Sequence, residues 1–354
     1  MGTRAPAAVL LACAMLAAGC RSSPSTDRAV APTTTSPATA PATTIAPATT
    51  ATAPATTAPA TTAPATTAPA TTAPATNPAG CPAFDGGALT GRLANPAITE
   101  ASGLAASHRN AGVLWAHNDS GDTARVFATD ATGADLGTFA LAGAGAIDWE
   151  DIAVGPGPDP ATSYVYAGDI GGNSGRNAVT VYRVAEPSVP PGAPPAVTTL
   201  DGVARLDAVY PGGGRFDAES LFIDPRSTDL YIVTKSLDGL SRVLRWPATA
   251  QTPGVTATLE EVATHRFAPP SIPMATGADI SPDGTEVVVR TYDRVFLWRR
   301  PAGTSVAAAL AQPPCGYPVP AGALGEAVAF TADGRDLVLT TEGAGAPVHT
   351  LTRG

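Results

Sequence analysis

From residue 88 onward the chain reads as short runs in which apolar and polar residues alternate, separated by turns of Gly, Pro, Asp or Asn. This period of two indicates β-strands, and no stretch of the region keeps the period of an amphipathic helix. Runs of similar order and spacing recur five times. Because repeated strand groups bury their apolar faces against one another, the pattern predicts an all-β fold, a β-propeller with one blade per group.

Each group supplies the strands of one blade, with the innermost strand first. We predict innermost strands at residues 100–105, 148–154, 217–223, 275–281 and 324–330. Second strands follow at residues 112–117, 164–169, 229–234, 286–291 and 336–341. Third strands are predicted at residues 124–130, 178–185, 241–247, 294–300 and 347–352, and fourth strands at residues 135–141, 202–210 and 256–265. Blade four has a weak fourth candidate at residues 306–310, and blade five has none.

The chain ends after the third strand of blade five, while residues 88–96 have no partner in the first group. We expect this N-terminal strand to complete blade five, because closing the ring removes open sheet edges. The five groups predict five blades. A ring of six blades is the alternative, and it requires the long insertion around residues 187–195 to divide blade two.

The N-terminus has the features of an export signal. Residues 1–20 carry a single basic residue, followed by an apolar run that is too short to cross a bilayer. The run ends in Leu-Ala-Ala-Gly-Cys at residues 16–20, which resembles a bacterial lipobox. The resemblance implies a lipoprotein whose Cys20 receives diacylglycerol and anchors the chain at the extracytoplasmic face of the cell membrane. An ordinary secretory signal, cleaved near residue 18, is the alternative.

Residues 21–80 form a low-complexity segment rich in Ala, Pro and Thr, with a Pro-Ala-Thr-Thr-Ala period over residues 54–76. Such a sequence has almost nothing to bury, so we predict a disordered, extended spacer of about 3.1 Å per residue. Its threonines beside Pro and Ala suit O-glycosylation. The propeller domain is therefore expected at residues 81–354.

Four cysteines occur in the chain. Cys13 lies in the signal sequence and Cys20 is the predicted lipid acceptor, which leaves Cys81 and Cys315 in the folded domain. Two cysteines in an oxidising compartment predict one disulfide where the spacer enters the domain, with a free buried pair as the alternative.

The folded region is acidic, since residues 81–354 contain 29 acidic and 18 basic residues, a net charge of −11. The basic residues are not clustered along the chain. This charge disfavours nucleic acid and anionic membrane surfaces as partners.

Several phrases of the inner strands resemble those of an uncharacterised family of secreted bacterial β-propeller lipoproteins, in the broad TolB-like, phytase-like and SMP-30-like propeller group. The phrases are residues 118–121, 148–153, 168–171 and 277–284. The resemblance spans residues 99–345 and implies the propeller architecture. It carries no established activity, because propellers host hydrolases, lyases, dehydrogenases and binding proteins alike.

Aligning the inner strands places Glu150, Glu219 and Glu326 at one position, with Ser102 and Gly277 in the other two blades. The acids two residues earlier share that strand face, and they are Glu100, Asp148 and Asp217. Because inner strands converge on the propeller axis, the three glutamates are predicted to repel one another unless protonated, paired or bound to a cation. Carboxylate oxygens suit Ca²⁺, so they form a candidate calcium site. The alternative is that the acids bond to Arg and Ser and tie the blades together.

The ends of the second strands form a second candidate cluster. In blade order these positions hold Asn118 with Asp119, Asp169, Lys235, Arg290 and Glu342. Lys235 is the only lysine in the chain, which favours a specific role for it, since ammonium and guanidinium are not interchangeable. Two cations beside several acids at one mouth of the channel predict a site for a small anion or polyol, bridged to a metal.

Two classes of function fit these residues. We favour a binding or scaffolding module for an extracellular ligand or protein. The alternative is a Ca²⁺-dependent hydrolase, a phosphoesterase or lactonase, with its site at the central channel. His117 is the candidate general base, and a histidine packed beside the turn after its strand is the plainer interpretation.

Overall fold

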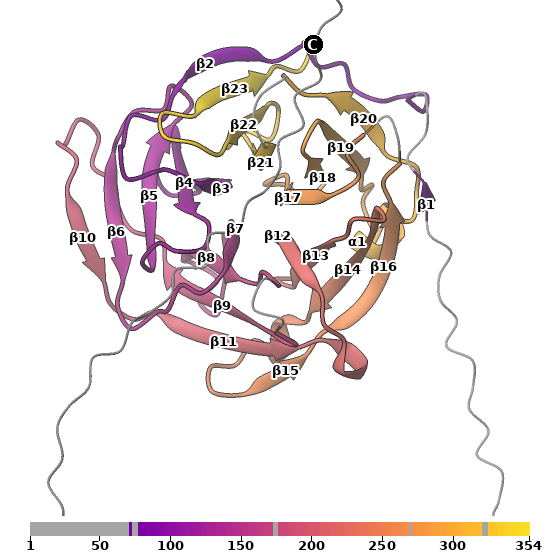
Figure 1. Ribbon diagram of the computed structural model, residues 1–354, viewed down its shortest axis with the longest axis horizontal. Helices are drawn as coiled ribbons and strands as arrows, with labels where there is room; N and C mark the ends of the chain where they lie inside the picture. Colours follow the sequence, from indigo (N-terminus) through magenta and orange to yellow (C-terminus); the bar gives the residue numbers. More distant parts are fainter. Residues whose placement is uncertain (1–70, 73–76, 173–175, 269–270, 321–324) are drawn as a thin grey trace, which may run out of the picture. The chain divides into compact units, whose positions relative to one another are not determined.

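The computed structural model describes residues 71–72, 77–172, 176–268, 271–320 and 325–354. These residues form five sheets arranged as the blades of a ring, which is a five-bladed β-propeller (Figure 1). The predicted fold class and number of blades are confirmed, and the six-bladed alternative is wrong. The predicted signal sequence, Cys20 and almost all of the predicted spacer lie outside the described residues.

Each blade places its innermost strand at the axis and its later strands successively outward (Figure 1). Blade one contains β3 (Ala101–Ala106), β4 (Val113–Asn118), β5 (Arg125–Asp130) and β6 (Gly137–Leu141). Blade two contains β7 (Trp149–Pro156), β8 (Ser163–Asp169), β9 (Ala178–Ala185) and β11 (Ala204–Val209). Blade three contains β12 (Asp217–Ile223), β13 (Leu230–Lys235), β14 (Leu240–Trp246) and β16 (Glu260–Arg266).

Blades four and five complete the ring. Blade four contains β17 (Ala275–Ile280), β18 (Glu286–Thr291), β19 (Arg294–Arg299) and β20 (Cys315–Pro318). Blade five contains β21 (Gly325–Phe330), β22 (Leu337–Thr341), β23 (Pro347–Leu351) and β2 (Ala88–Arg92). Strand β2 pairs antiparallel with β23, so the N-terminal strand closes the ring as expected.

The predicted fourth strand of blade four is wrong. Residues 306–310 form the short helix α1 (Val306–Leu310), whose N-terminus is capped by the Ser305 side chain. Val306, Ala309 and Leu310 are buried, and this spacing of three and four residues is that of a helix face. The fourth strand of blade four is instead β20, which was not predicted from the sequence.

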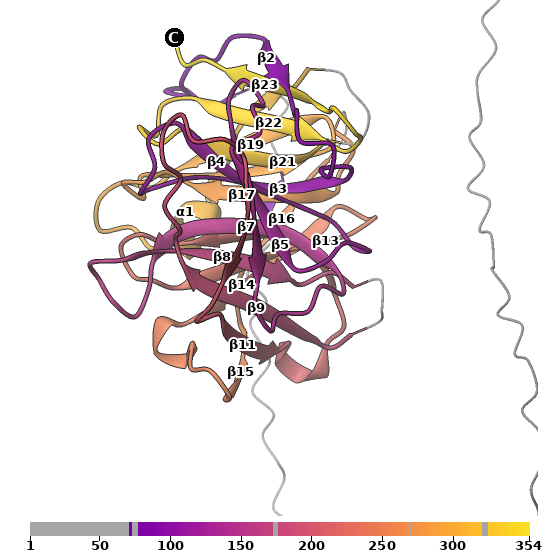
Figure 2. The ribbon, with the colours of Figure 1, turned by 90° about the vertical axis from the view of Figure 1, so that its left-hand side faces the viewer.

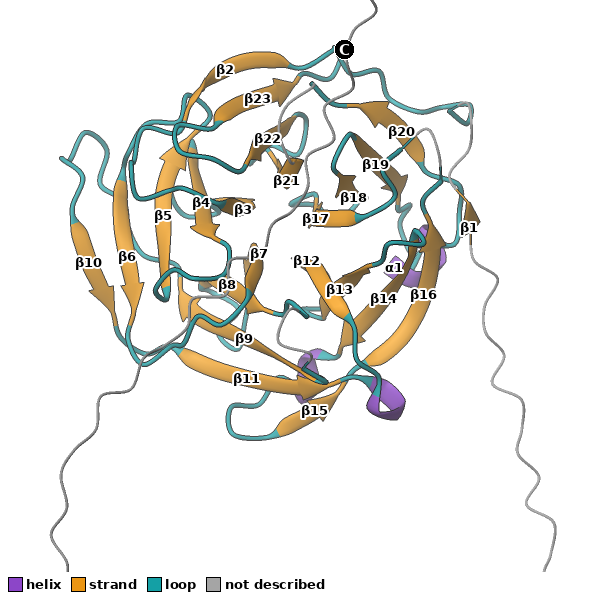
Figure 3. Ribbon diagram, in the orientation of Figure 1, coloured by secondary structure: helices purple, strands orange, loops and turns teal. Residues whose placement is uncertain are grey.

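Three blades carry an additional outer strand that pairs parallel to its neighbour. Strand β10 (Val197–Leu200) pairs with β6, β15 (Thr256–Thr258) with β11, and β1 (Thr71–Thr72) with β16. The insertion after β9 therefore leads to the outer edge of blade one and does not divide blade two. Strand β1 belongs to the segment predicted to be a disordered spacer. Figure 3 shows the short helical segments outside the innermost strands.

The innermost strands of neighbouring blades contact one another around the axis, and Figure 2 shows the ring from the side. A Cβ atom on Gly103 would lie 2.8 Å from the backbone nitrogen of Ile152, and one on Gly277 would lie 2.6 Å from the carbonyl oxygen of Glu326. Both distances are shorter than a carbon atom tolerates, so the approach of neighbouring blades requires glycine.

Two buried aspartates satisfy backbone groups at the axis. Asp151 accepts hydrogen bonds from the N–H groups of Ile152, Leu221 and Ala278, at 2.9, 2.8 and 3.1 Å. Asp279 in blade four accepts from Phe330 of blade five at 2.8 Å. An innermost strand has no neighbour on its axial side, so these N–H groups need side-chain acceptors. The carboxylates therefore join strands of different blades.

The two domain cysteines form a disulfide, with Cα atoms 5.7 Å apart. Cys315 lies in β20, and the bridge ties Cys81 to the outer strand of blade four. The hydroxyl group of Tyr317 donates to the carbonyl oxygen of Pro82 at 2.6 Å, which reinforces the same contact. The segment that leads into β2 is thus attached to blade four, and β2 itself completes blade five.

We predict that removing this bridge lowers the free energy of unfolding. The cysteines are separated by 234 residues, so the bridge restricts a long loop of the unfolded chain, an effect of about 2–5 kcal/mol. Urea unfolding of the Cys81→Ser/Cys315→Ser variant should give the decrease. A reductant should produce the same decrease in the native chain and leave the variant unchanged. Equal stability of the native chain with and without reductant would contradict the prediction.

Candidate functional site

All five inner strands carry a β-bulge near their first residue. The register against the second strand shifts after Ala101, Trp149, Ala218, Ala275 and Gly325. In each inner strand the next residue occupies the same position relative to the bulge. These five equivalent residues are Ser102, Glu150, Glu219, Thr276 and Glu326. The predicted equivalence of the three glutamates agrees with this register. The member from blade four is Thr276 and not Gly277, because Gly277 already pairs with Arg290.

These bulges lie at one end of the ring, which we call the axial mouth. It is the end at which the inner strands begin and the second strands finish, as the pairing of Ala101 with Asn118 shows. Carboxylates of four blades interact electrostatically there. They are Glu100, Asp119, Asp148, Glu150, Asp217, Glu219, Glu326 and Glu342.

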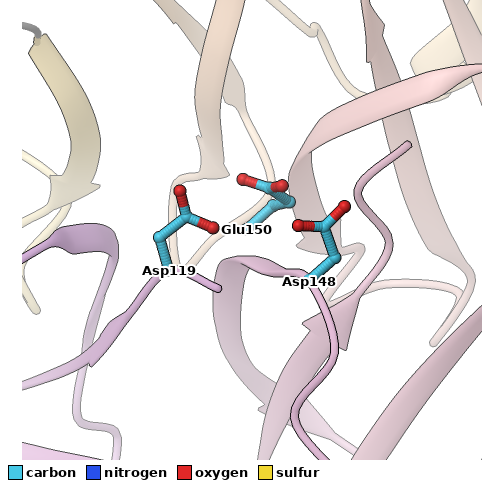
Figure 4. A group of neighbouring side chains, drawn as sticks. All are labelled: Asp119, Asp148 and Glu150. Atoms are coloured by element: carbon cyan, nitrogen blue, oxygen red, sulfur yellow. The ribbon is translucent and has the colours of Figure 1, made fainter. Parts of the chain in front are cut away.

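Two groups of carboxylates are close enough to share a cation. Asp119, Asp148 and Glu150 form the first group (Figure 4), and Glu150, Asp217 and Glu219 form the second. In each group the ligand atoms lie within 4.8 Å of one another. Glu150 belongs to both groups. Of the three glutamates that the sequence analysis combined, Glu150 and Glu219 thus meet in one group, and Glu326 is in neither.

Glu150 is buried without a full set of partners. Its side chain is 2% exposed, and its Oε1 atom has no hydrogen-bond partner among the described residues. Burying a carboxylate oxygen without a donor or a positive charge is costly. The site therefore contains an oxygen atom that the surrounding protein leaves unsatisfied.

The loop after β8 is shaped around these acids. A Cβ atom on Gly171 would overlap Glu150 Oε1 and the carboxyl group of Asp148. The next residue, Gly172, donates its backbone N–H to Asp217 Oδ1 at 2.7 Å. Two glycines are needed here because a side chain would fill the space beside the carboxylates. Of these two glycines, the sequence phrase at residues 168–171 contains only Gly171.

Burial raises the pKa of the glutamates at the mouth. The pKa of Glu150 lies well above its ordinary value because of burial and then of Glu219 and Asp119. Burial also raises the pKa of Glu326 to about 7, although Lys235 opposes the shift. Burial raises the pKa of Glu219 as well, and Lys235 again opposes the shift. A positive charge bound at the mouth would oppose these upward shifts of pKa.

Lys235 forms its ion pair within its own blade, with Glu219. Its Nζ atom also lies 5.4 Å from the centre of the Tyr292 ring. Burial would lower the pKa of Lys235, but the charge of Glu219 outweighs it and raises that pKa above its ordinary value. The cluster predicted from the ends of the second strands combined Lys235 with Arg290, Asp169 and Glu342. Lys235 lies at the mouth, but its direct partner is Glu219.

Arg290 is buried between strands and bonds to backbone carbonyl oxygens, although its charge acts on Glu326 of the mouth, so its predicted place in a ligand site is not supported. It is 2% exposed, and its Nη1 atom donates to the carbonyl oxygens of Ala327 and Thr340 at 2.5 and 2.7 Å. Burial lowers its pKa to about 10. Because β18 ends at Thr291, Tyr292 occupies the position that corresponds to Lys235.

Asn118 and Asp169 hold loops and are not free to bind a ligand, which corrects their predicted role. Asn118 Oδ1 accepts the N–H groups of Thr99 and Glu100 at 3.0 and 3.2 Å. Asp169 accepts the N–H groups just before β7 in the same way, at 3.2 Å each, and forms an ion pair with Arg176. Both residues end a second strand and fix the start of their inner strand. They therefore position the acids rather than act beside them.

His117 is a core residue, so its candidacy as a general base fails. It is 0% exposed, and its ring packs edge-on against Trp149 at a centroid distance of 5.6 Å. Its Nδ1 atom lies 2.7 Å from the carbonyl oxygen of Asn118. Burial lowers its pKa to about 4. The plainer interpretation of this histidine describes it correctly.

Two surface cavities of the domain lie away from these acids. One of about 430 Å³ is lined by Arg125, Asp135 and residues 195–197, beside β6 and β10. The other, of about 520 Å³, is lined by residues 109–113 and 188–193. Neither contains a carboxylate of the mouth.

Comparisons with known proteins add little to this description. No family model matches the chain, and no curated protein matches it. Among solved structures, the chain is similar to one in the "Crystal Structure of Mitotic Checkpoint Complex", with 14% identity and a TM-score of 0.32. The match covers 70% of this chain and 62% of that chain. A likeness of this size carries no argument about function.

The described strands define a five-bladed β-propeller, a fold that hosts many unrelated functions. Within the part of the chain that is described, no helix is long and apolar enough to cross a membrane.

We predict that Lys235→Met destabilises the domain by leaving Glu219 buried without its cation, a loss of up to about 3 kcal/mol. Glu219 would then take up a proton in the folded state at a pH where the unfolded state does not. The loss should therefore be larger at pH 8 than at pH 5. Chemical unfolding at both pH values measures it.

The matched control is the double variant Lys235→Met/Glu219→Gln, which removes the unpaired charge and should recover most of the stability. A Lys235→Met variant as stable as the native chain at pH 8 would show that the pair does not hold the mouth together.

Proposed function

We propose that the protein is a lipid-anchored binding or scaffolding module at the extracytoplasmic face of the cell membrane. Its axial mouth binds an extracellular protein partner that presents basic side chains flanked by apolar ones. The proposal combines the export features of residues 1–20 with the chemistry of the mouth. Its strongest support is the excess of carboxylates over cations where the inner strands converge.

Charge favours a cationic partner over the small anion that the sequence analysis favoured. Arg290 is buried between strands, and Lys235 is paired with Glu219. The carboxylates that remain, among them Asp119 and Glu342, repel an anion and attract a basic group. An acidic patch of this kind raises the rate of association with a basic partner and selects against acidic ones.

Three exposed aliphatic side chains accompany the acids. Ile147, Leu237 and Ile272 are 59%, 86% and 47% exposed. They belong to loops that enter β7, leave β13 and enter β17, and such loops lie at the mouth end of their blades. Protein-binding surfaces combine apolar and polar side chains, so these residues suit a partner that presents both kinds of group.

The hydrolase alternative receives less support. It needs a group at the mouth that takes a proton from water, and His117, the candidate from the sequence, lies in the core. We therefore retain binding as the proposed function.

We predict that the mouth binds a short peptide of alternating Lys and Leu, and does not bind the same peptide with Glu in place of Lys. Fluorescence anisotropy with the full chain measures both. Added salt should weaken the interaction, because exposed charges are screened. The Leu237→Ser variant should bind about tenfold more weakly, because burial of a Leu side chain contributes about 1.5 kcal/mol or more.

Val197→Ser is the matched control, since Val197 is 79% exposed but begins β10 at the end of blade one opposite the mouth. It should bind as the native chain does. Equal binding of both peptides, or an equal effect of Leu237→Ser and Val197→Ser, would refute the proposed surface.

We also predict that Cys20→Ser releases the protein from the membrane fraction and prevents its labelling with a fatty acid. Fractionation and metabolic labelling in a bacterial host measure the two effects. Unlabelled native protein would contradict the anchor and leave an ordinary secretory signal as the explanation.

A further inference from the structure

The axial mouth contains two overlapping groups of carboxylates and one residue common to both. Glu150 contributes to the group with Asp119 and Asp148 and to the group with Asp217 and Glu219. An acidic cluster alone is not a binding site. The unsatisfied oxygen of Glu150 is a second observation, because the side chain is 2% exposed and Oε1 has no partner among the described residues.

We infer that a divalent cation, with Ca²⁺ the best match, binds between Asp119, Asp148 and Glu150 and joins blade one to blade two. Asp119 follows the last residue of β4, whereas Asp148 and Glu150 stand at the start of β7. The cation would be held by two different blades where their edges meet at the axis. Figure 4 shows the three carboxyl groups turned toward a common space.

The spacing of the ligand atoms fits calcium. Ca²⁺ binds carboxylate oxygens at about 2.3–2.6 Å, so two oxygens on opposite sides of it are about 4.8 Å apart. The oxygens of this group lie within 4.8 Å of one another, so one calcium ion can contact all three carboxylates. Mg²⁺ demands near-ideal octahedral geometry and gives up its water reluctantly, so a group made of carboxylates suits it less. Ca²⁺ takes six to eight ligands, so three carboxylates leave further positions for water.

The first group suits the cation better than the second because the second already has a positive partner. Glu219 is paired with the ammonium group of Lys235. Backbone N–H donors do not separate the two groups, since Asp217 accepts from Gly172 and Asp119 accepts from Ser120. A cation between Glu150 and Glu219 would have to compete with Lys235, and the two positive charges would repel each other.

Gly171 supports the same assignment. A Cβ atom at this position would overlap Glu150 Oε1 and the Asp148 carboxyl group, so any other residue would take space that belongs to the site. The backbone N–H of Gly171 donates to the carbonyl oxygen of Asp148 at 3.1 Å and holds the loop in place. The loop thus leaves room beside two ligands of the first group.

This inference does not rest on the proposed basic partner. A single doubly charged cation leaves the carboxylates of the mouth in excess, so both can hold together. The experiment uses Ca²⁺ alone as the probe, and its failure would leave the peptide measurements unaffected.

The test is calorimetric titration of the metal-free full chain with CaCl₂, accompanied by the melting temperature at each concentration. We expect binding near the range of extracellular calcium modules, about 0.1–1 mM, and a melting temperature that rises with Ca²⁺. Mg²⁺ should bind more weakly. Glu150→Gln should abolish the heat of binding and the rise in melting temperature.

Further variants separate the two groups. Asp119→Asn should weaken Ca²⁺ binding, whereas the matched variant Asp217→Asn should retain it. Glu150→Gln removes like-charge repulsion and should fold, and Asp119→Asn at the partly exposed position provides a second measurement if it does not. Absence of heat and of a thermal shift in the native chain up to about 10 mM Ca²⁺, well above that range, would overturn the inference. Loss of binding in Asp217→Asn with retention in Asp119→Asn would overturn the assignment to the first group.

Discussion

The close approach of five inner strands at one axis is the constraint on which the rest of the structure depends. It leaves no room for side chains at Gly103 and Gly277. It also brings strand edges together whose backbone N–H groups have no strand partner, and the protein meets this need with buried carboxylates. Asp151 accepts from strands of its own blade, blade three and blade four. The axis is therefore held by charge-bearing side chains as well as by apolar packing.

The same convergence creates the site at the mouth. A β-bulge near the start of each inner strand places one extra residue at the axis, and three of these residues are glutamates. Acids that are far apart in the sequence meet because the ring repeats one position around its centre. Burial then raises their pKa, and the mouth becomes a place where protons, a lysine and other cations compete for the same oxygens.

Much of the architecture could be predicted from the sequence because alternation of apolar residues reports on strands directly. The unpaired N-terminal strand was enough to predict the closure by β2. The count of cysteines was enough to predict the pairing of Cys81 with Cys315. The exceptions have local causes. Helix α1 has apolar residues that suit either structure over five positions, and β20 lacks an alternating pattern long enough to recognise.

The site was less predictable because it depends on register at the level of single residues. Aligning second strands by their apolar runs placed Arg290 beside Lys235, but the bulge register puts Tyr292 there. Asn118, Asp169 and His117 are polar residues near a strand end, which is equally compatible with binding and with holding a loop. Only their hydrogen bonds to Thr99, Ile147 and Asn118 distinguish the two roles.

Two neighbouring residues show how the axis separates structure from function. Asp151 is fully buried and accepts three backbone N–H groups, so its charge or proton is accommodated by the fold itself. Glu150, one residue earlier and almost as buried, has an oxygen with no donor. The bulge turns Glu150 out of the ladder toward the mouth, beyond the backbone groups that satisfy its neighbour. The same strand thus satisfies one carboxylate with backbone donors and leaves an oxygen of the adjacent one without a donor, and this contrast is what the inferred cation site rests on.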